Sequence, residues 1–304
     1  MFKNVLVGVD GRGGGRDAIA LARRLVDGSE GKLTLAHVRR GATNPYHAVV
    51  PGLLDEEYDA SVKLLENERD AAAVAAELVS VVSPSAGRGL HEEAEAQGAD
   101  LIVVGSCKRG VVGRVMVGDD ASAALNGAPC AVGVAIGGYS HKAGPLAKLG
   151  VAYNGSPESE STLELARELA SETGASVSAL EVVHLSAYML GGLALTPPMG
   201  DAIEAMLNEA QARMDALEGV EGGASYGLAG EDLARFGDGI DLLIVGSRSF
   251  GPVRRVVFGS TSWYLERHAH CSLLVLPRGA RSGARSGAGA RDARAHDAVP
   301  AKAG

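Results

Sequence analysis

Short aliphatic runs alternate along this chain with longer segments in which apolar residues return every three or four positions. The runs 5–9 and 101–104 hold no charged residue and are rich in valine and leucine, as is typical of parallel strands buried on both faces. In the segment that follows the first run, Ala18, Leu21 and Leu25 fall on one side of a helix. The pattern predicts strands that alternate with amphipathic helices.

The same periodicity places most of the remaining elements. It predicts long helices over 55–78 and 201–217, second strands over 33–38 and 177–183, and a third strand over 79–82. A helical stripe in the second half of the chain, formed by Leu163, Ala166, Leu169 and Ala170, repeats the stripe near the N-terminus.

The chain contains an internal repeat with a period of nearly half its length. Segment 5–11 recurs as 149–155, segment 99–106 as 240–247, and segment 128–132 as 269–273. A repeat this long indicates a duplicated domain rather than a solenoid. We therefore place one domain at 1–138 and a second at 147–278, joined by a linker over 138–145.

Each domain is thus predicted to be an α/β domain, with a doubly wound five-stranded parallel sheet of the Rossmann-like class. Ligands of such sheets bind beyond the carboxyl ends of the strands, where the strand order reverses. The residues that follow 5–9 and 101–104, and their copies, are therefore the candidate site residues.

Composition narrows the functional classes. With 304 residues, 46% hydrophobic and 22% charged, the chain suits about two globular domains of roughly 150 residues each. A net charge of −8 argues against broad binding of nucleic acid. No apolar run reaches the roughly 18 residues of a membrane span, so we expect no membrane association. Three cysteines without metal-type spacing favour a reducing, cytoplasmic compartment.

The last segment, 279–304, consists mainly of glycine, alanine, arginine and serine. Such a composition cannot bury apolar surface, which predicts a disordered, mildly basic tail.

A glycine-punctuated loop follows the fourth predicted strand of the second domain. It runs from Gly246 through Gly251 to Gly259 and enters a helix at Ser260 and Thr261. Backbone amides, the positive end of the helix and two hydroxyls together suit a polyphosphate. Ser260 is equally compatible with a simple helix N-cap.

This arrangement resembles the universal stress protein family in its tandem-domain form, over nearly the whole chain except the tail. The family's nucleotide loop reads G-x2-G-x9-G-[ST], and the second domain has Gly246, Gly259 and Ser260 at that spacing, with Ser249 at the second glycine. The resemblance implies that Asn154 contacts the adenosine end of a nucleotide and that Val182 contacts the base.

The first domain departs further from the family's loop. It has Gly105 and Gly118, but Lys108 replaces the second glycine and Asp119 replaces the hydroxyl. Asp119 brings a negative charge toward a phosphate site, or acts as an N-cap. Asp10 and Val38 match the family's adenosine and base contacts, so this domain is predicted to be a degenerate site and the second domain the main one.

The resemblance implies a stress-response regulator that binds ATP or a related adenine nucleotide, with Mg²⁺ as a candidate companion ion. A homodimer and an unidentified regulatory protein partner also belong to this expectation. Two alternatives remain open, a nucleotide-free interaction scaffold and a weak nucleotide hydrolase. The hydrolase is disfavoured because no general base is paired with a nucleophile near either loop, and we expect no enzyme activity beyond weak ATP hydrolysis.

Weaker signals complete the prediction. Gly11 to Arg16 does not complete a dinucleotide fingerprint. Cys107, beside Lys108, is either a redox-sensitive thiolate or an inert thiol. His268 and His270 lack the ligands of a metal site. The aliphatic strands near 131–136 and 273–276 would leave open sheet edges, so we expect them to pair across a pseudo-twofold axis.

Overall fold

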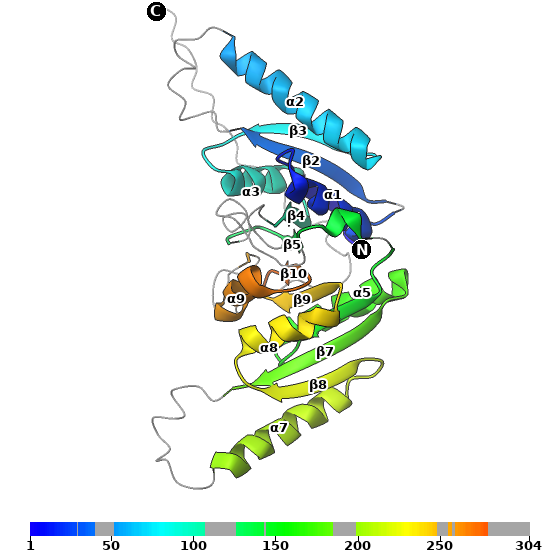
Figure 1. Cartoon of the computed structure of the whole chain (residues 1–304), viewed down its shortest axis with the longest axis vertical. Helices are drawn as coiled ribbons and strands as arrows, with labels where there is room; N and C mark the ends of the chain where they lie inside the picture. The colour runs from blue at the N-terminus through cyan, green and yellow to red at the C-terminus, as the bar shows by residue number, and fades with distance from the viewer. Residues whose placement is uncertain are drawn as a thin grey trace, which may run out of the picture.

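The computed structural model describes residues 1–28, 30–39, 52–106, 126–142, 144–184, 199–247, 255–256 and 259–278. We call residues 1–138 half one and residues 147–278 half two. Each half contributes five strands to one continuous sheet, and helices pack against that sheet along its length (Figure 1).

Within half one, strands and helices alternate in the predicted order. The elements are β1 (Asn4–Gly8), α1 (Gly13–Leu25), β2 (Lys32–Arg39), α2 (Leu53–Ala72), β3 (Glu77–Val82), α3 (Ala86–Gln97), β4 (Leu101–Gly105) and β5 (Ala131–Ala135).

Half two repeats this order after a short 3-10 turn, η2 (Tyr139–His141). Its elements are β6 (Lys148–Ala152), α5 (Pro157–Thr173), β7 (Ser176–Val183), α7 (Met199–Asp215), β8 (Glu221–Tyr226), α8 (Ala229–Phe236), η3 (Gly237–Gly239), β9 (Leu242–Gly246), α9 (Ser260–His268) and β10 (Ser272–Leu276).

The sheet has the strand order β3-β2-β1-β4-β5-β10-β9-β6-β7-β8. All neighbours within a half are parallel, whereas β5 and β10 are antiparallel and pair Leu274 with Gly133 at their centre. The pairing of these two strands across a pseudo-twofold axis is confirmed. Each half thereby removes the open edge that its fifth strand would otherwise leave.

The core follows from the aliphatic runs. Leu6, Val7, Leu243 and Ile244 are completely buried, as parallel strands covered on both faces require. The helical stripe of Ala18, Leu21 and Leu25 is buried as well, which confirms the periodicity.

The end of α2 differs from the prediction of a helix over 55–78. The helix ends at Ala72 because Ala73 adopts a left-handed conformation with φ of 48°, and its N–H donates to the carbonyls of Arg69 and Asp70. Glycine usually occupies this position, so the sequence gives no stop signal there. The third strand consequently begins at Glu77, two residues before its predicted start.

The connection between the halves is anchored at two buried residues, although most of its other described residues are exposed. Tyr139 and Leu146 are buried, and the carboxylate of Asp17 on α1 accepts hydrogen bonds from the N–H groups of Gly138 and Ser140 at 2.8 and 2.7 Å. Asp17 itself is 4% exposed. A buried carboxylate satisfied by two backbone donors fixes the course of the chain between the halves.

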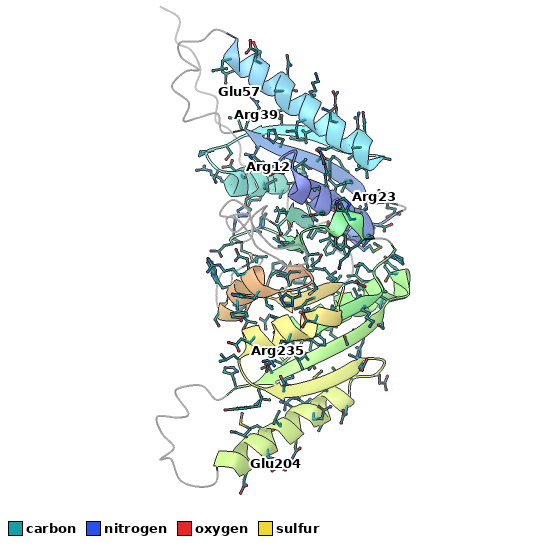
Figure 2. All side chains as sticks on the ribbon, viewed as in Figure 1. Arg12, Arg23, Arg39, Glu57, Glu204 and Arg235 are labelled. Carbon is teal, nitrogen blue, oxygen red and sulfur yellow. The ribbon has the colours of Figure 1, made fainter. Side chains whose placement is uncertain are left out.

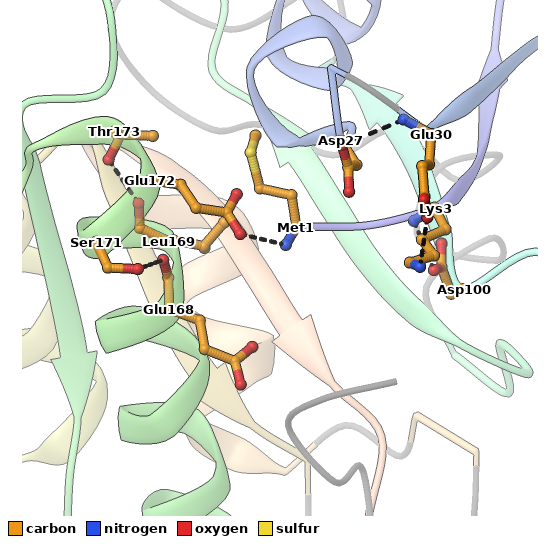
Figure 3. A network of polar contacts seen from close by, with 10 residues as sticks. All are labelled: Met1, Lys3, Asp27, Glu30, Asp100, Glu168, Leu169, Ser171, Glu172 and Thr173. Carbon is orange, nitrogen blue, oxygen red and sulfur yellow. Dashed lines mark hydrogen bonds and ion pairs between the residues drawn. The ribbon is translucent and has the colours of Figure 1, made fainter. Parts of the chain in front are cut away.

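The N-terminus also links the two halves. Figure 3 shows the Met1 ammonium group directed at α5, where it lies 3.1 Å from Oε1 of Glu172. Beside it, Lys3 pairs with Glu30 while its N–H donates to Asp100.

The outermost helices are α2 and α7, on which Glu57 and Glu204 mark opposite ends of the molecule (Figure 2). Among the described residues, no helix combines the length and the apolarity needed to cross a bilayer.

Candidate functional site

The strand order reverses between β1 and β4 in half one and between β6 and β9 in half two, which marks two candidate sites. Continuing the register from the Gly8–Ala36 pair places Asp10 level with Val38. The Ala152–Leu180 pair likewise places Asn154 level with Val182. The sheet therefore brings each predicted adenosine contact beside its predicted base contact at the carboxyl edge.

Asp10 and Asn154 make the same local turn in the two halves. Oδ1 of Asp10 accepts from the N–H of Arg12 at 3.0 Å, and Oδ1 of Asn154 accepts from the N–H of Ser156 at 3.1 Å. Arg12 precedes α1 and is labelled in Figure 2. Both side chains are exposed, and one oxygen of each closes the turn. The other carboxylate oxygen of Asp10 lies 3.9 Å from Nε of Arg12.

Two carboxylates, exposed Glu160 and buried Glu181, fix the strand ends of half two. Tyr153, just before Asn154, donates its hydroxyl to Glu160 on α5. Burial, reinforced by Glu160, raises the pKa of Tyr153 to about 12, which keeps this donor protonated. On the neighbouring strand, buried Glu181 accepts from Arg213 of α7 at 2.7 Å. These contacts tie β6 and β7 to the helices that follow them.

We call the two places where the strand order reverses the switch points. They differ at one position in the first turn of the neighbouring helix, which is α1 in half one and α5 in half two. A Cβ added to Gly105 would lie 1.8 Å from the carbonyl oxygen of Gly14, so α1 begins in backbone contact with the end of β4. In half two Glu158 occupies the place of Gly14, and a Cβ on Gly246 would lie 3.3 Å from the Cβ of Glu158. The backbone of the helix is thus in direct contact with the end of β4 in half one, whereas in half two the backbone oxygen of Glu158 would lie 3.5 Å from the added Cβ.

Glu158 pairs with the residue that ends the described chain. Nε of Arg278 lies 3.6 Å from Oε1 of Glu158, and the two side chains are 39% and 17% exposed. Glu158 was not among the sequence-predicted site residues, and neither was Arg278. A carboxylate in the first turn of a helix is an ordinary feature, and the two residues are 120 positions apart in the sequence, so no local pattern could have joined them.

The N-terminus of α9 suits an anion. Its N-cap is Gly259, which has no side chain to accept from the first N–H groups; among the described residues no side chain caps this end, and the first turn of the helix carries no acidic residue. Ser260 is exposed and Thr261 half-buried at this end. Uncapped N–H groups and the helix dipole favour a negatively charged ligand.

A pair of serines occupies matching positions just beyond β4 and β9. The N–H of Ser106 donates to Ala135 and that of Ser247 to Leu276, at 3.0 and 2.9 Å. Within the described residues, the buried hydroxyl of neither serine has a hydrogen-bond partner. Buried hydroxyls at the start of both loops are compatible with a polar ligand or water at these edges.

Several sequence-predicted residues lie outside the described residues. They are Gly118 and Ser249 of the two nucleotide loops, the degenerate-loop residues Lys108 and Asp119, the candidate redox thiol Cys107, and the tail over 279–304. The switch points thus bring together Asp10, Val38 and Gly105 in one half and Asn154, Val182 and Gly246 in the other.

The surroundings of two cysteines and of the two histidines near the end of α9 indicate structural roles. Burial raises the pKa of Cys130 and of Cys271 to about 12, so both remain unreactive thiols at neutral pH. Nδ1 of His268 contacts the carbonyl of Tyr264, and Nδ1 of His270 contacts Asp238. Where the chain is described, no group of three metal-ligating side chains occurs.

A chain of hydrogen bonds joins β2, β3 and α2 next to Val38. Nε of Arg39 donates to Ser80, whose hydroxyl lies 2.7 Å from that of Ser61, and Ser61 lies 2.8 Å from Nδ1 of His37. Ser61 is buried, so this chain links α2 to the sheet. Burial lowers the pKa of His37, and Arg39 adds to that effect against the opposing charge of Asp10.

We expect this histidine to make stability pH-dependent. Because its folded pKa lies below the ordinary 6.5, acidification below that value protonates the unfolded chain first and stability is lost. Urea unfolding at pH 7.5 and at pH 5.5 should show a smaller loss for His37→Gln than for the unmodified chain. The exposed His141 provides the control His141→Gln, and an equal pH effect in both variants would contradict this prediction.

A cavity of about 490 Å³ lies elsewhere in half two, at the amino end of β7. It is lined by Arg167, Ser176 and Glu218 among others, and Arg167 donates to the Glu218 carbonyl at 2.9 Å. None of the sequence-predicted site residues that the structure describes borders it.

Comparisons with known proteins agree with this geometry. A model of the universal stress protein family matches residues 1–135 and 146–277. A universal stress protein of Mycobacterium tuberculosis is 28% identical over 210 residues, which cover 64% of this chain and 69% of the relative. A putative universal stress protein from Pseudomonas aeruginosa has a TM-score of 0.62 at 17% identity, covering 90% of this chain and 93% of its own. One from Archaeoglobus fulgidus has a TM-score of 0.61 at 16% identity, with coverages of 91% and 98%. With two matches in tandem that together span most of its length, the chain belongs to the universal stress protein family.

Proposed function

We propose that this protein is a stress-response regulator that binds ATP or a related adenine nucleotide in half two. The observation that carries the proposal is the uncapped N-terminus of α9 with exposed Ser260, which ends the glycine loop that leaves β9. Nucleotide phosphates would lie at this N-terminus, and the adenosine end would lie at Asn154 and Val182. Release or uptake of the nucleotide would change the surface offered to a regulatory partner.

The residues of the proposed site suit a nucleotide, except that one negative charge opposes binding of its phosphates. Glu158 directs a carboxylate toward the switch point, and repulsion between like charges a few ångströms apart costs about 1 kcal/mol in water and several times more where water is scarce. Arg278 lies against Glu158 and offsets this charge. Glu158 is also the specific observation that favours the alternative function, a nucleotide-free interaction scaffold with the same fold.

Replacing Glu158 distinguishes the two functions. We expect Glu158→Gln to strengthen binding of ATP roughly five- to thirtyfold, because the carboxylate no longer repels the phosphates. Adenosine carries no phosphate, so its affinity should remain unchanged. Equilibrium dialysis of the full chain with each ligand measures both affinities.

Glu164→Gln is the matched control, since Glu164 is an exposed carboxylate on the same helix. Absence of ATP binding in the unmodified chain and in Glu158→Gln would overturn the nucleotide proposal in favour of the scaffold. Protein purified without added nucleotide gives a further check, because co-purifying adenine absorbance is expected only for the binding protein. Multiple turnover of ATP would instead indicate a hydrolase.

A further inference from the structure

The nucleotide loop of half two is attached to half one. Arg255 and Val256 belong to this loop, three or four residues before Gly259. The N–H of Val256 donates to the carbonyl of Ala128 at 3.0 Å, and the N–H of Gly127 donates to the carbonyl of Val256 at 2.9 Å. Both Val256 and Ala128 are completely buried.

The arginine of this segment reinforces the attachment. One nitrogen of Arg255 donates to the carbonyl of Gly127 at 2.9 Å, and another lies 2.8 Å from Oε1 of Glu95 on α3. An arginine in a phosphate loop would be the natural ligand of a phosphate. Here the guanidinium is instead engaged with half one.

We infer that half one positions the nucleotide loop of half two through a clasp formed by Arg255, Val256, Glu95, Gly127 and Ala128. The inference rests on the proposed function, because the loop it positions is the proposed phosphate site. Of the described residues of this loop, Ser247 donates to Leu276 of β10 and Val256 is bonded to half one, three residues before the N-cap Gly259 of α9. Half one, with its degenerate loop, thereby acts as a positioning element for the site of its neighbour.

The clasp depends on the backbone of Gly127. This residue has φ of +88°, a conformation that favours glycine, and it is the donor to Val256 as well as the acceptor from Arg255. Arg255 and Glu95 are 46% and 50% exposed, so their ion pair alone contributes little. Arg255 acts instead through its hydrogen bond to the carbonyl of Gly127, which holds the Gly127 backbone in position to donate to Val256.

Two measurements on the full chain test this inference. In ligand-free protein, Arg255→Ala should speed amide hydrogen exchange at Val256 and Gly127, and Glu95→Gln should do so less. In equilibrium dialysis with ATP, Arg255→Ala should weaken binding roughly three- to tenfold, because a loop that is not held in place must be ordered on binding.

Arg88 and Glu92 supply matched controls, since they form an exposed ion pair on α3. Arg88→Ala and Glu92→Gln should alter neither measurement. Unchanged exchange in Arg255→Ala would overturn the clasp, and faster exchange with unchanged ATP affinity would overturn its positioning role. If the unmodified chain binds no ATP, the proposed function fails, and the exchange measurement by itself decides whether half one holds the loop.

Discussion

Replacing Gly105 by alanine is expected to destabilise the protein by about 3 kcal/mol, at the upper end of overpacking effects. The new methyl group would lie 1.8 Å from the carbonyl oxygen of Gly14. That atom belongs to the backbone of α1, so it cannot rotate away as the end of a side chain would. Relief requires α1 to move off the end of β4, where its buried face packs. Urea unfolding monitored by circular dichroism measures the loss.

The duplicated sequence provides the matched control. Gly246 holds the same place in half two, but an added Cβ there would lie 3.3 Å from the Cβ and 3.5 Å from the backbone oxygen of Glu158, so only a small displacement is needed. We expect Gly246→Ala to cost about 1 kcal/mol or less. Similar losses in the two variants would show that the halves do not differ at their switch points in the way described.

Removal of the Ser260 hydroxyl is expected to weaken ATP binding roughly 10- to 150-fold. A hydrogen bond to a charged group contributes about 1.5–3 kcal/mol, and each 1.4 kcal/mol is a factor of ten in affinity. Ser260 begins α9 and is exposed, so Ser260→Ala should leave folding stability nearly unchanged. Equilibrium dialysis with ATP, beside urea unfolding of the same variant, separates the two effects.

Ser171→Ala serves as the control, because Ser171 is an exposed serine in the last turn of α5. Unchanged ATP affinity in Ser260→Ala would mean that the phosphates do not reach the start of α9. The proposal of a nucleotide site in half two would then lose its main support.

Most of the fold could be predicted from the sequence because its signals are local or repeated. Buried valine and leucine runs specify strands wherever they occur, and the recurrence of 99–106 as 240–247 predicts that both halves share one fold. The pairing of β5 with β10 followed from the aliphatic composition of two strands that would otherwise form edges. The end of α2 could not be predicted, because Ala73 adopts a conformation that its side chain disfavours.

The candidate site was predictable only in part. The carboxyl-edge residues Asp10 and Asn154 follow recognisable strands, so topology alone brings them to the switch points. Sequence treats Gly105 and Gly246 as equivalent, yet their surroundings differ because Gly14 is replaced by Glu158 in the second copy. Contacts between distant segments, such as Arg255 with Glu95, arise from tertiary packing. The spacing of residues along the sequence cannot predict them.

The antiparallel junction of β5 and β10 has a consequence for the shape of the molecule. At the junction the strands of the two halves run in opposite directions. Neighbouring strands also rotate by about 20–25° each, so a sheet of ten strands accumulates a rotation of roughly 180–220° between its outer edges. The rotation offsets the reversal, and β2 and β7 consequently end on the same side of the molecule (Figure 1). The outer strands of the two halves therefore end on a common side of the molecule, although the two strands that join the halves run in opposite directions.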